Sequence, residues 1–568
     1  MARLTELPVE LCVRILRDLP ALEIVRFQQV SRSFLDFIRG SVELQYLVER
    51  FLAGVADVSP SPQHSLRDKL DRLRTWSDAW NGAKWTEQHV VPFRSAERHV
   101  SGPVIAFALG NSPRYRSISF YLTGSQSRGI APRTWSIEDL DDFSMFAFDW
   151  YQDLLVLVSS DYQDGVAKLR LLTCSTGTSH PAAINPTLAI ELSEEHNYEL
   201  KYLYICGDLL GFRSSDTTSR SIELSVHDWK QDRLLMHIGV DERAIDSDDP
   251  VPDSYAFLDS RHVLVTTWGD EAEVQVMAVF DCRASATPRR VVFPEALQDS
   301  ALLVLEMPRM TTRATRHESV MYKLFCAPNS PSALHAQTAG AAFRAAASPV
   351  VAICITANGL ITEHCLLISG RFLLAQIARI HAQGAASSVV RIPWQAYAHE
   401  CRIVERRPGK AVVHGARFAT WADNPGDSTD GGSSEPLIRI WHFDEPAAVR
   451  RQAGLLDAEP GPGNASSDDM FPLPASDCVL ETEDYSRGPS PCGSDTEGSN
   501  IGHSSDGSTA EGSRSDDSAH QIWREPMPLG APHVTTWTDV QSNGARVFSL
   551  IEDGLVVLGG NHTEILTL

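Results

Sequence analysis

The fold is decided by Leu7-Pro8-Val9-Glu10-Leu11 and by the pairs Ile15-Leu16 and Leu19-Pro20 that follow it. Pro8 suits the first turn of a helix, where its missing N–H removes no intrahelical hydrogen bond. Leu11 and Ile15 then share one helical face, while an adjoining stripe is made of Cys12, Leu16 and Leu19. The stretch therefore predicts a short helix with two apolar stripes.

Two more short helices are expected directly after it. Pro20 opens the second, which carries Leu22, Ile24, Val25 and Phe27. Ser31 is expected to cap a third helix, which holds Phe34, Phe37 and Ile38 and ends at Gly40. So small a unit cannot bury this much apolar surface alone, so we expect a partner to cover the remainder.

This order of residues resembles an F-box. The matching patterns are Leu7-Pro8-x-Glu10-Leu11, Ile15-Leu16-x-x-Leu19-Pro20 and Val30-Ser31-x-x-Phe34. The resemblance implies that residues 1–50 dock on a Skp-type adaptor and so join a cullin-RING ubiquitin ligase. It assigns the docking surface or its support to Leu7, Pro8, Glu10, Leu11, Ile15, Leu16 and Val30. The alternative is an ordinary amphipathic start to a globular protein.

Composition indicates a folded protein with no nucleic-acid partner. The 568 residues are 43% hydrophobic, which is enough for a sizeable core. The net charge of -23 argues against phosphate binding, which needs basic patches. The sequence shows neither the apolar region of a signal peptide nor a run long enough to span a membrane. Its ten scattered cysteines are typical of reduced core thiols, which favours a cytoplasmic or nuclear location.

Residues 51–95 are expected to form a helical extension. Ser41 can cap a fourth helix that Gly54 ends, and Ser65-Leu66-Arg67-Asp68 resembles a capping box. An amphipathic helix follows, with Leu66, Leu70, Leu73, Trp76 and Trp80 at helical spacings. We expect this helix to pack the N-terminal unit against the next domain.

From about residue 96 to 568 the period of hydrophobicity changes to two, as in β-strands. An apolar strand entered through an acidic turn recurs at Leu154, Leu209 and Val263, which are 55 and 54 residues apart. Each copy is followed by a second alternating strand. This spacing suits the blades of a β-propeller-like domain; the alternative is a set of β-sandwiches. The fold class is therefore an α-helical N-terminal part followed by an all-β domain.

Later strands fit the same scheme less regularly. They are expected at 319–326, 350–356 and 437–444, and a hairpin is expected at 553–568. A propeller is often closed by pairing strands from the two ends of its sequence. We expect the hairpin to pair with a strand near Val104 to Leu109 or Ile118 to Leu122.

A second resemblance concerns the segment Ile392-Pro393-Trp394-Gln395-Ala396-Tyr397, followed by Arg402 and His414-Gly415-Ala416-Arg417-Phe418. It is similar to a late signature of a large mushroom-type (basidiomycete) family of fungal F-box proteins. That family's usual Trp-Gly-Pro is replaced here by Tyr397-Ala398-His399. The resemblance implies one architecture from end to end and names no substrate.

Two insertions interrupt the β region. Residues 422–436 are rich in Gly, Ser and Asp and predict a flexible loop. Residues 453–521 predict a disordered acidic insertion, because the stretch between Asp457 and Ser518 holds fourteen carboxylates against two arginines and few apolar residues. Hydroxyls just ahead of acids, as in Ser494-Asp495-Thr496-Glu497, suit acid-directed kinases; an inert solubilising loop is the alternative.

The sequence shows no catalytic or metal-binding motif, so we expect no catalytic residues, no cofactor and no metal. His364 and Cys365 are adjacent and would point to opposite faces of a strand, and His399 and Cys401 supply only two ligands. Asp141-Asp142 and Asp248-Asp249 suit solvated turns.

The favoured function is a non-catalytic, substrate-recruiting subunit of a Skp-cullin-F-box type ubiquitin ligase. Its F-box would dock the adaptor and its β domain would bind a target protein. The first alternative is a propeller-type interaction scaffold outside any ligase. The second is a propeller enzyme, which the missing motifs disfavour.

Overall fold

The computed structural model describes most of the chain outside its long insertions. The described residues are 7–57, 64–82, 85, 87–91, 97–111, 114–159, 166–191, 198–216, 222–240, 254–268, 275–285, 287–293, 296–308, 320–326, 343–345, 349–357, 363–384, 389–406, 411–415, 417–422, 437–443, 534–541, 547–551, 554–558 and 563–567. The predicted insertion at 453–521 lies outside them, as does the predicted loop at 422–436 except for Ala422, which ends a strand. None of the described helices is long and apolar enough to cross a membrane.

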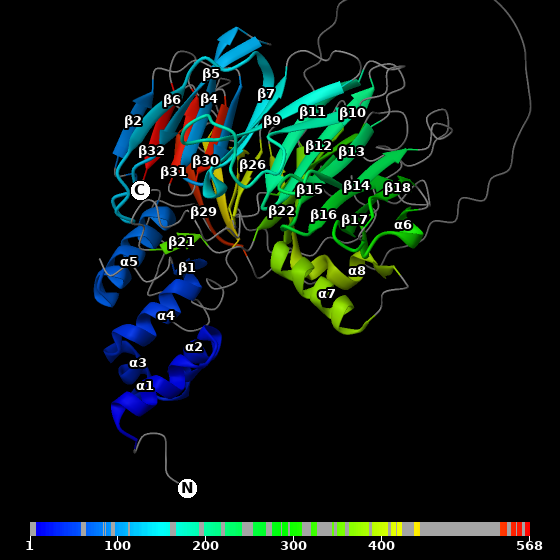
Figure 1. Cartoon of the computed structure of the whole chain (residues 1–568). Helices are drawn as coiled ribbons and strands as arrows, with labels where there is room; N and C mark the ends of the chain where they lie inside the picture. The colour runs from blue at the N-terminus through cyan, green and yellow to red at the C-terminus, as the bar shows by residue number, and fades with distance from the viewer. Residues whose placement is uncertain are drawn as a thin grey trace, which may run out of the picture.

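The N-terminal part is a stack of helices that extends from the β region (Figure 1). Its elements are α1 (Val9–Arg17), α2 (Ala21–Val30), α3 (Arg32–Gly40), α4 (Val42–Leu52), the short strand β1 (Val55–Asp57) and α5 (Leu66–Gly82). The predicted caps are confirmed, because Ser31 Oγ accepts the N–H of Phe34 at 3.3 Å and Ser41 Oγ accepts that of Leu44 at 3.4 Å. The three predicted helices therefore form as expected, and the extension that follows them includes the predicted helix α5.

The β region consists of seven groups of four antiparallel strands, which we number one to seven. Groups one and two are joined into one sheet by the single pair Tyr115–Phe143. The groups are: one, β3 (Arg98–Ser101), β4 (Val104–Asn111), β5 (Arg114–Leu122) and β6 (Arg133–Ile137); two, β7 (Phe143–Asp149), β8 (Leu154–Ser159), β9 (Val166–Thr173) and β10 (Thr187–Glu191); three, β11 (Tyr198–Cys206), β12 (Leu209–Asp216), β13 (Ile222–Asp228) and β14 (Arg233–Val240); four, β15 (Ser254–Phe257), β16 (His262–Trp268), β17 (Gln275–Asp281) and β19 (Leu303–Glu306); five, β20 (Val320–Cys326), β22 (Val350–Ala357), β23 (Glu363–Ser369) and β25 (Cys401–Arg406); six, β26 (Val412–His414), β27 (Arg417–Ala422), β28 (Leu437–Phe443) and β29 (Val534–Gln541); seven, β30 (Val547–Ile551), β31 (Gly554–Leu558), β32 (Thr563–Thr567) and β2 (Glu87–Val91).

The predicted strand repeat is confirmed. Its three copies are β8, β12 and β16, each the second strand of its group, and the strands that follow them are β9, β13 and β17. The acidic turn before β8 shows how one of these aspartates acts. Asp153 adopts a left-handed conformation (φ 57°), and its carboxylate accepts the N–H of Ser175 at 2.8 Å. In this copy the aspartate therefore ties the turn before β8 to the residues that follow β9.

The strands of group seven join segments from opposite ends of the sequence. β32 pairs antiparallel with β31 and, on its other edge, with β2, and Figure 1 shows blue β2 beside red β32. The predicted partner near residues 104–109 or 118–122 is therefore wrong. Those strands instead contact the hairpin through side chains, because the fully buried Ile565 packs against Ile105, Phe107 and Tyr121.

The first strands of the seven groups lie next to one another. β3 contacts β7, and the contacts continue in order through β11, β15, β20, β26 and β30. β30 in turn contacts β3. Neighbouring groups also share apolar clusters, such as the one that joins β16 and β17 to β22 and β23. The core therefore lies between successive groups.

Further strands and helices lie outside the four-strand groups. β18 (Arg289–Phe293) and β24 (Val390–Ile392) add parallel strands to groups three and four, and β21 (Phe343–Ala345) pairs with β1. The short helix α6 (Ala296–Asp299) precedes β19. Helix α7 (Gly370–Ala382), which was not predicted, buries Leu373, Ile377 and Ile380 at helical spacing. The short helix α8 (Trp394–Tyr397) packs in the same cluster.

Two expectations from the sequence need correction. The range 51–95 is not wholly helical, since it contributes β1 and β2 to sheets. The expectation of reduced thiols fails for Cys354 and Cys365, which face each other on β22 and β23 and are joined in a disulfide. The other described cysteines lie outside this disulfide, and all of them except Cys326 are buried: Cys12, Cys174, Cys206, Cys282, Cys326 and Cys401.

Candidate functional site

The first candidate site is the outer face of α1. Its two apolar stripes separate as the spacing predicts, because Cys12 and Leu16 are buried while Leu11 and Ile15 are 46% and 45% exposed. Leu16 packs in a small core whose other members are Ile24, Val25, Ile38, Leu44, Val48 and Leu52. One stripe therefore holds the helices together, and the other is left without cover.

Some of the remaining predicted docking residues are exposed and others are buried. Pro8 and Glu10 are exposed and Leu7 is half-buried. Val30, the last residue of α2, is 67% exposed. Leu16, by contrast, is fully buried, so in this arrangement it supports the surface and does not form it. Val9, which the sequence pattern did not single out, is 60% exposed. Val9 lies one helical turn before Val13 on α1, and this spacing alone did not indicate that Val9 would be exposed.

The second feature of interest is the joint between the N-terminal helices and the β region. The predicted capping box starts α5, since the Ser65 N–H donates to Asp68 Oδ2 (3.2 Å) and the Asp68 N–H donates to Ser65 Oγ (3.1 Å). The Ser65 hydroxyl, which donates to Asp68 Oδ2 at 2.7 Å, and the Ser65 N–H hold the pKa of the Asp68 carboxyl below its usual value. Arg74 of α5 then donates to Glu49 Oε1 at 3.3 Å and to Gln45 Oε1 at 2.8 Å, both on α4. The middle of α5 is thus tied to α4.

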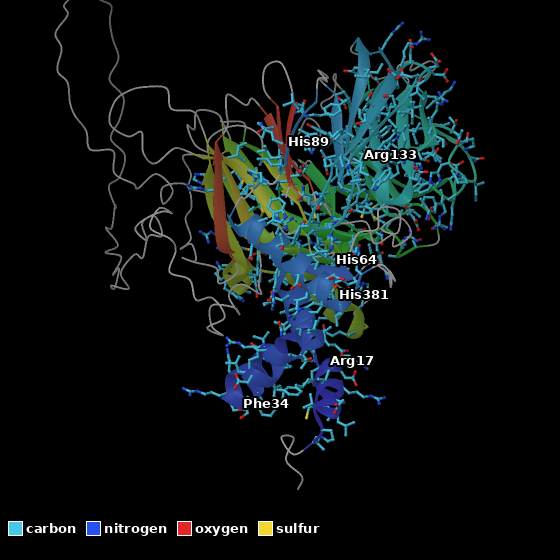
Figure 2. All side chains as sticks on the ribbon, turned by 90° about the vertical axis from the view of Figure 1, so that its left-hand side faces the viewer. Arg17, Phe34, His64, His89, Arg133 and His381 are labelled. Carbon is cyan, nitrogen blue, oxygen red and sulfur yellow. A yellow bond between two sulfur atoms is a disulfide. The ribbon has the colours of Figure 1, made fainter. Side chains whose placement is uncertain are left out.

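The end of α5 is tied to the β region. Trp76 and Trp80 are nearly fully buried, in a cluster with Phe343, Ile438, Ile440 and Leu555 from the sheets. The guanidinium of Arg417 on β27 lies 3.8 Å from the ring centroid of Trp80, a cation–π contact. The predicted packing role of this helix is confirmed, although Leu66 at its start is exposed. In Figure 2, Arg17 and Phe34 on the N-terminal helices lie at one end of the molecule, and His89 and Arg133 lie toward the other.

The third feature is a cavity of about 570 Å³ in the β region. Its wall comes from the first strands of groups one to six or from residues next to them, represented by His99, Asp149, Tyr204, Phe257, Cys326 and His414. Gly102, at its rim, has a φ of +55°, and a Cβ there would meet the Tyr151 hydroxyl at 2.6 Å. Backbone and side chain therefore pack closely at this edge.

The cavity lining is aromatic with a few polar groups. Tyr202 and Tyr204 stack with ring centroids 6.3 Å apart, and the Arg213 guanidinium lies 5.6 Å from the Tyr202 ring centroid. Burial raises the pKa of Tyr204 to about 12, so its hydroxyl stays protonated and can donate a hydrogen bond. His99 Nε2 lies 3.2 Å from Glu97 Oε1. Such a lining can hold a peptide side chain or a small molecule by stacking and hydrogen bonds.

Among the described residues, no group of metal ligands forms around the histidine–cysteine pairs considered in the sequence. The His364 and Cys365 side chains are both buried, and Cys365 is in the disulfide. His399 is exposed beside Glu400, and Cys401 is buried with its thiol donating to Tyr397 O. Within the described residues, a single group of three metal-ligand side chains does come together, His262, Asp281 and His381. Sequence reasoning missed this group because its members are far apart along the chain.

Comparison with known proteins bears on the N-terminal helices. The F-box domain family matches residues 4–45. No curated protein matches the chain. Among solved structures, the chain is similar to cobalt-substituted Synechocystis ACO, with 8% identity and a TM-score of 0.23, over 50% of this chain and 60% of that one. A likeness this weak carries no argument about fold or function. The chain therefore carries an F-box domain at residues 4–45, a domain that in general indicates a non-catalytic substrate receptor of an SCF-type ubiquitin ligase.

Proposed function

We propose that this chain recruits a protein target to a Skp-cullin-F-box ligase, with α1 and α2 on the adaptor and the β region on the target. The observation that carries the proposal is the uncovered apolar surface of the F-box helices. Val9, Leu11, Ile15 and Val30 are each 45–67% exposed, although the same helices have a well-packed core. An apolar surface of this kind indicates a protein partner.

We further propose that the β region is a seven-bladed propeller, with one blade in each strand group. Three observations support this reading. The first strands contact one another in order and β30 contacts β3. The first strands of six groups line one cavity. β2 and β32 share the seventh group, the arrangement by which propellers remove their exposed edges. The resemblance to the mushroom-type family supports the same architecture.

The proposed domain boundaries follow from the sequence. Residues 1–50 are the F-box, 51–95 the extension and 96–568 the propeller-like domain, to which the extension lends β2. The target would bind over the aromatic cavity, which lies in the β region and not among the F-box helices. An intracellular location, cytoplasmic or nuclear, is part of this proposal, and neither nucleic acid nor a membrane is among the partners.

Capture of a purified Skp-type adaptor by the full chain tests the docking surface. The double variant Pro8→Ala with Leu11→Ala is expected to bind at least tenfold more weakly, because buried leucine truncations cost about 2–5 kcal/mol and tenfold is about 1.4 kcal/mol. Arg14→Ala, an exposed change on the same helix, is the matched control and should bind normally. Unchanged binding of the double variant, at equal helicity, contradicts the docking assignment.

The alternative is an interaction scaffold whose helices only stabilise the β region. The burial of Trp76 and Trp80 against the sheets favours this alternative, since it shows that helix α5 contributes to the core of the β region. The two proposals differ in whether the chain binds a Skp-type adaptor. A full chain that folds and does not capture any Skp-type adaptor supports the scaffold.

A further inference from the structure

We propose that His262, Asp281 and His381 bind a divalent transition-metal ion that ties helix α7 to strands β16 and β17. One ligand atom from each side chain lies within 4.8 Å of the other two. The three residues come from the start of β16, the end of β17 and the last turn of α7. The site is separate from the F-box surface and from the cavity lining, and it does not depend on the proposed function.

His262 is prepared to act as a ligand. Its Nδ1 lies 2.9 Å from Asp259 Oδ2, and the Asp259 carboxylate is held in turn by the N–H groups of Arg261 and His262, both at 2.7 Å. A carboxylate at Nδ1 fixes the ring and leaves the lone pair on Nε2, the arrangement found behind metal-bound histidines. The His262 side chain is only 7% exposed, and its buried Nε2 has no hydrogen-bond partner among the described residues. A buried acceptor of this kind is costly unless something binds it.

Asp281 supplies the negative charge. The carboxylate accepts from Arg261 Nε at 3.0 Å on both oxygens, from Arg261 Nη2 at 2.6 Å and from the Arg283 N–H at 2.8 Å. These contacts come from three N–H donors, the Arg261 Nε–H being shared between the two oxygens, so one of the roughly four lone-pair sites of the carboxylate remains for a ligand bond. Arg261 is the competing cation.

His381 provides the movable ligand. Its ring centroid lies 6.1 Å from that of His262, and the residue is exposed. The helix beneath it is fixed, because Leu373, Ile377 and Ile380 are buried in the core. A rotation of the His381 side chain can therefore shorten the ligand distances without moving the backbone.

The ligand set indicates the class of ion. Two imidazoles and one carboxylate suit zinc, cobalt, nickel or iron(II), and they do not suit magnesium or calcium, which take all-oxygen sites. Three protein ligands leave positions for water, as in open zinc sites with bonds of about 2.0–2.2 Å. We commit to zinc, with cobalt(II) as its visible probe.

Titration of cobalt(II) into the full chain, made without a polyhistidine tag, tests the site. We expect a visible absorption band that saturates at one equivalent and disappears when zinc is added. His381→Ala, an exposed change, should weaken binding about 100-fold or more, and Asp259→Asn should weaken it about 10–100-fold, the usual effect of removing a carboxylate behind a ligand. His399→Ala is the matched control, because His399 is also exposed and lies outside the cluster. Its binding should equal that of the unaltered chain.

A thermal measurement gives an independent readout. Zinc should raise the Tm of the unaltered chain and of His399→Ala, and it should leave the Tm of His381→Ala unchanged, since an ion stabilises only the state that binds it. The proposal is overturned if no saturable cobalt band forms, if the band shows thiolate charge transfer from cysteine, or if His381→Ala binds as tightly as the unaltered chain. Because His381 is exposed, this variant decides the question even if Asp259→Asn does not fold.

Discussion

Ile565 is the residue through which the last strand is expected to stabilise the β region. It is fully buried on β32 against Ile105, Phe107 and Tyr121 of group one. Replacing it by alanine removes three carbons, which is about 2.5 kcal/mol of transfer free energy at about 0.8 kcal/mol per methylene. The cavity left behind adds to this, so we expect Ile565→Ala to lower the free energy of unfolding by about 3–4 kcal/mol, within the range of about 2–5 for such changes.

Urea unfolding of the full chain measures this effect, with Val90→Ala as the matched control. Val90 lies on β2, the strand paired with β32, but it is 60% exposed. Its removal should shift the urea midpoint by an amount equivalent to less than about 0.5 kcal/mol. Deleting residues 561–568 should go further and cause aggregation, because it leaves the facing edges of β2 and β31 unpaired. Equal midpoints for the two alanine variants, or a truncated chain that melts normally, would refute a closing role for β32.

Three further predictions concern separate parts of the chain. Burial lowers the pKa of His227 to about 4, so the neutral ring stabilises the fold fully above about pH 6.5, and this contribution is lost as the pH falls toward 4. Relative to His227→Phe, the free energy of unfolding of the unaltered chain should fall by about 2–3 kcal/mol between pH 7.5 and 4.5, as measured in urea titrations. Parallel pH curves for the two chains would contradict this. Trp80→Ala should lower the free energy of unfolding by about 3–5 kcal/mol, because Trp80 is buried, as read from urea midpoints. Leu66→Ala, an exposed change on the same helix, should lower it by less than about 0.5 kcal/mol. Equal effects of the two changes would show that α5 is not anchored through Trp80. Replacing residues 456–518 by a short Gly/Ser linker should leave the Tm nearly unchanged, because loop length enters closure entropy only logarithmically; loss of cooperative melting would show that this acidic stretch packs on the fold.

Features determined by residues close in sequence were predictable. The two stripes of α1, the caps at Ser31 and Ser41 and the capping box at Ser65 depend on spacings of three or four residues, and each is present. The strand repeat was predictable for the same reason, since an aspartate turn and an alternating strand recur within each copy. The exposed stripe of α1 could be read from the sequence in the same way.

Features determined by contacts between distant residues were not predictable. The pairing of β2 with β32 depends on which strand edges remain open in the folded chain, and the sequence Glu87-Gln88-His89-Val90-Val91 has too short an alternation to reveal a strand. The Cys354–Cys365 bond depends on a strand register that no local pattern fixes. The grouping of His262 and Asp281 with His381 needed helix α7, whose apolar spacing was overlooked among the surrounding strands.

The partnership of β2 and β32 has a consequence for the synthesis of the chain. A ribosome releases the F-box helices first, and their small core is local, so they can fold and meet an adaptor while translation continues. β2 emerges soon afterwards but has to wait for β32, near the other end of the sequence, before its edge is covered. During that interval the nascent β region carries an open edge strand, the kind of surface that chaperones protect and that aggregates if left alone. An adaptor bound to the F-box at that stage would hold a chain whose β region is still incomplete.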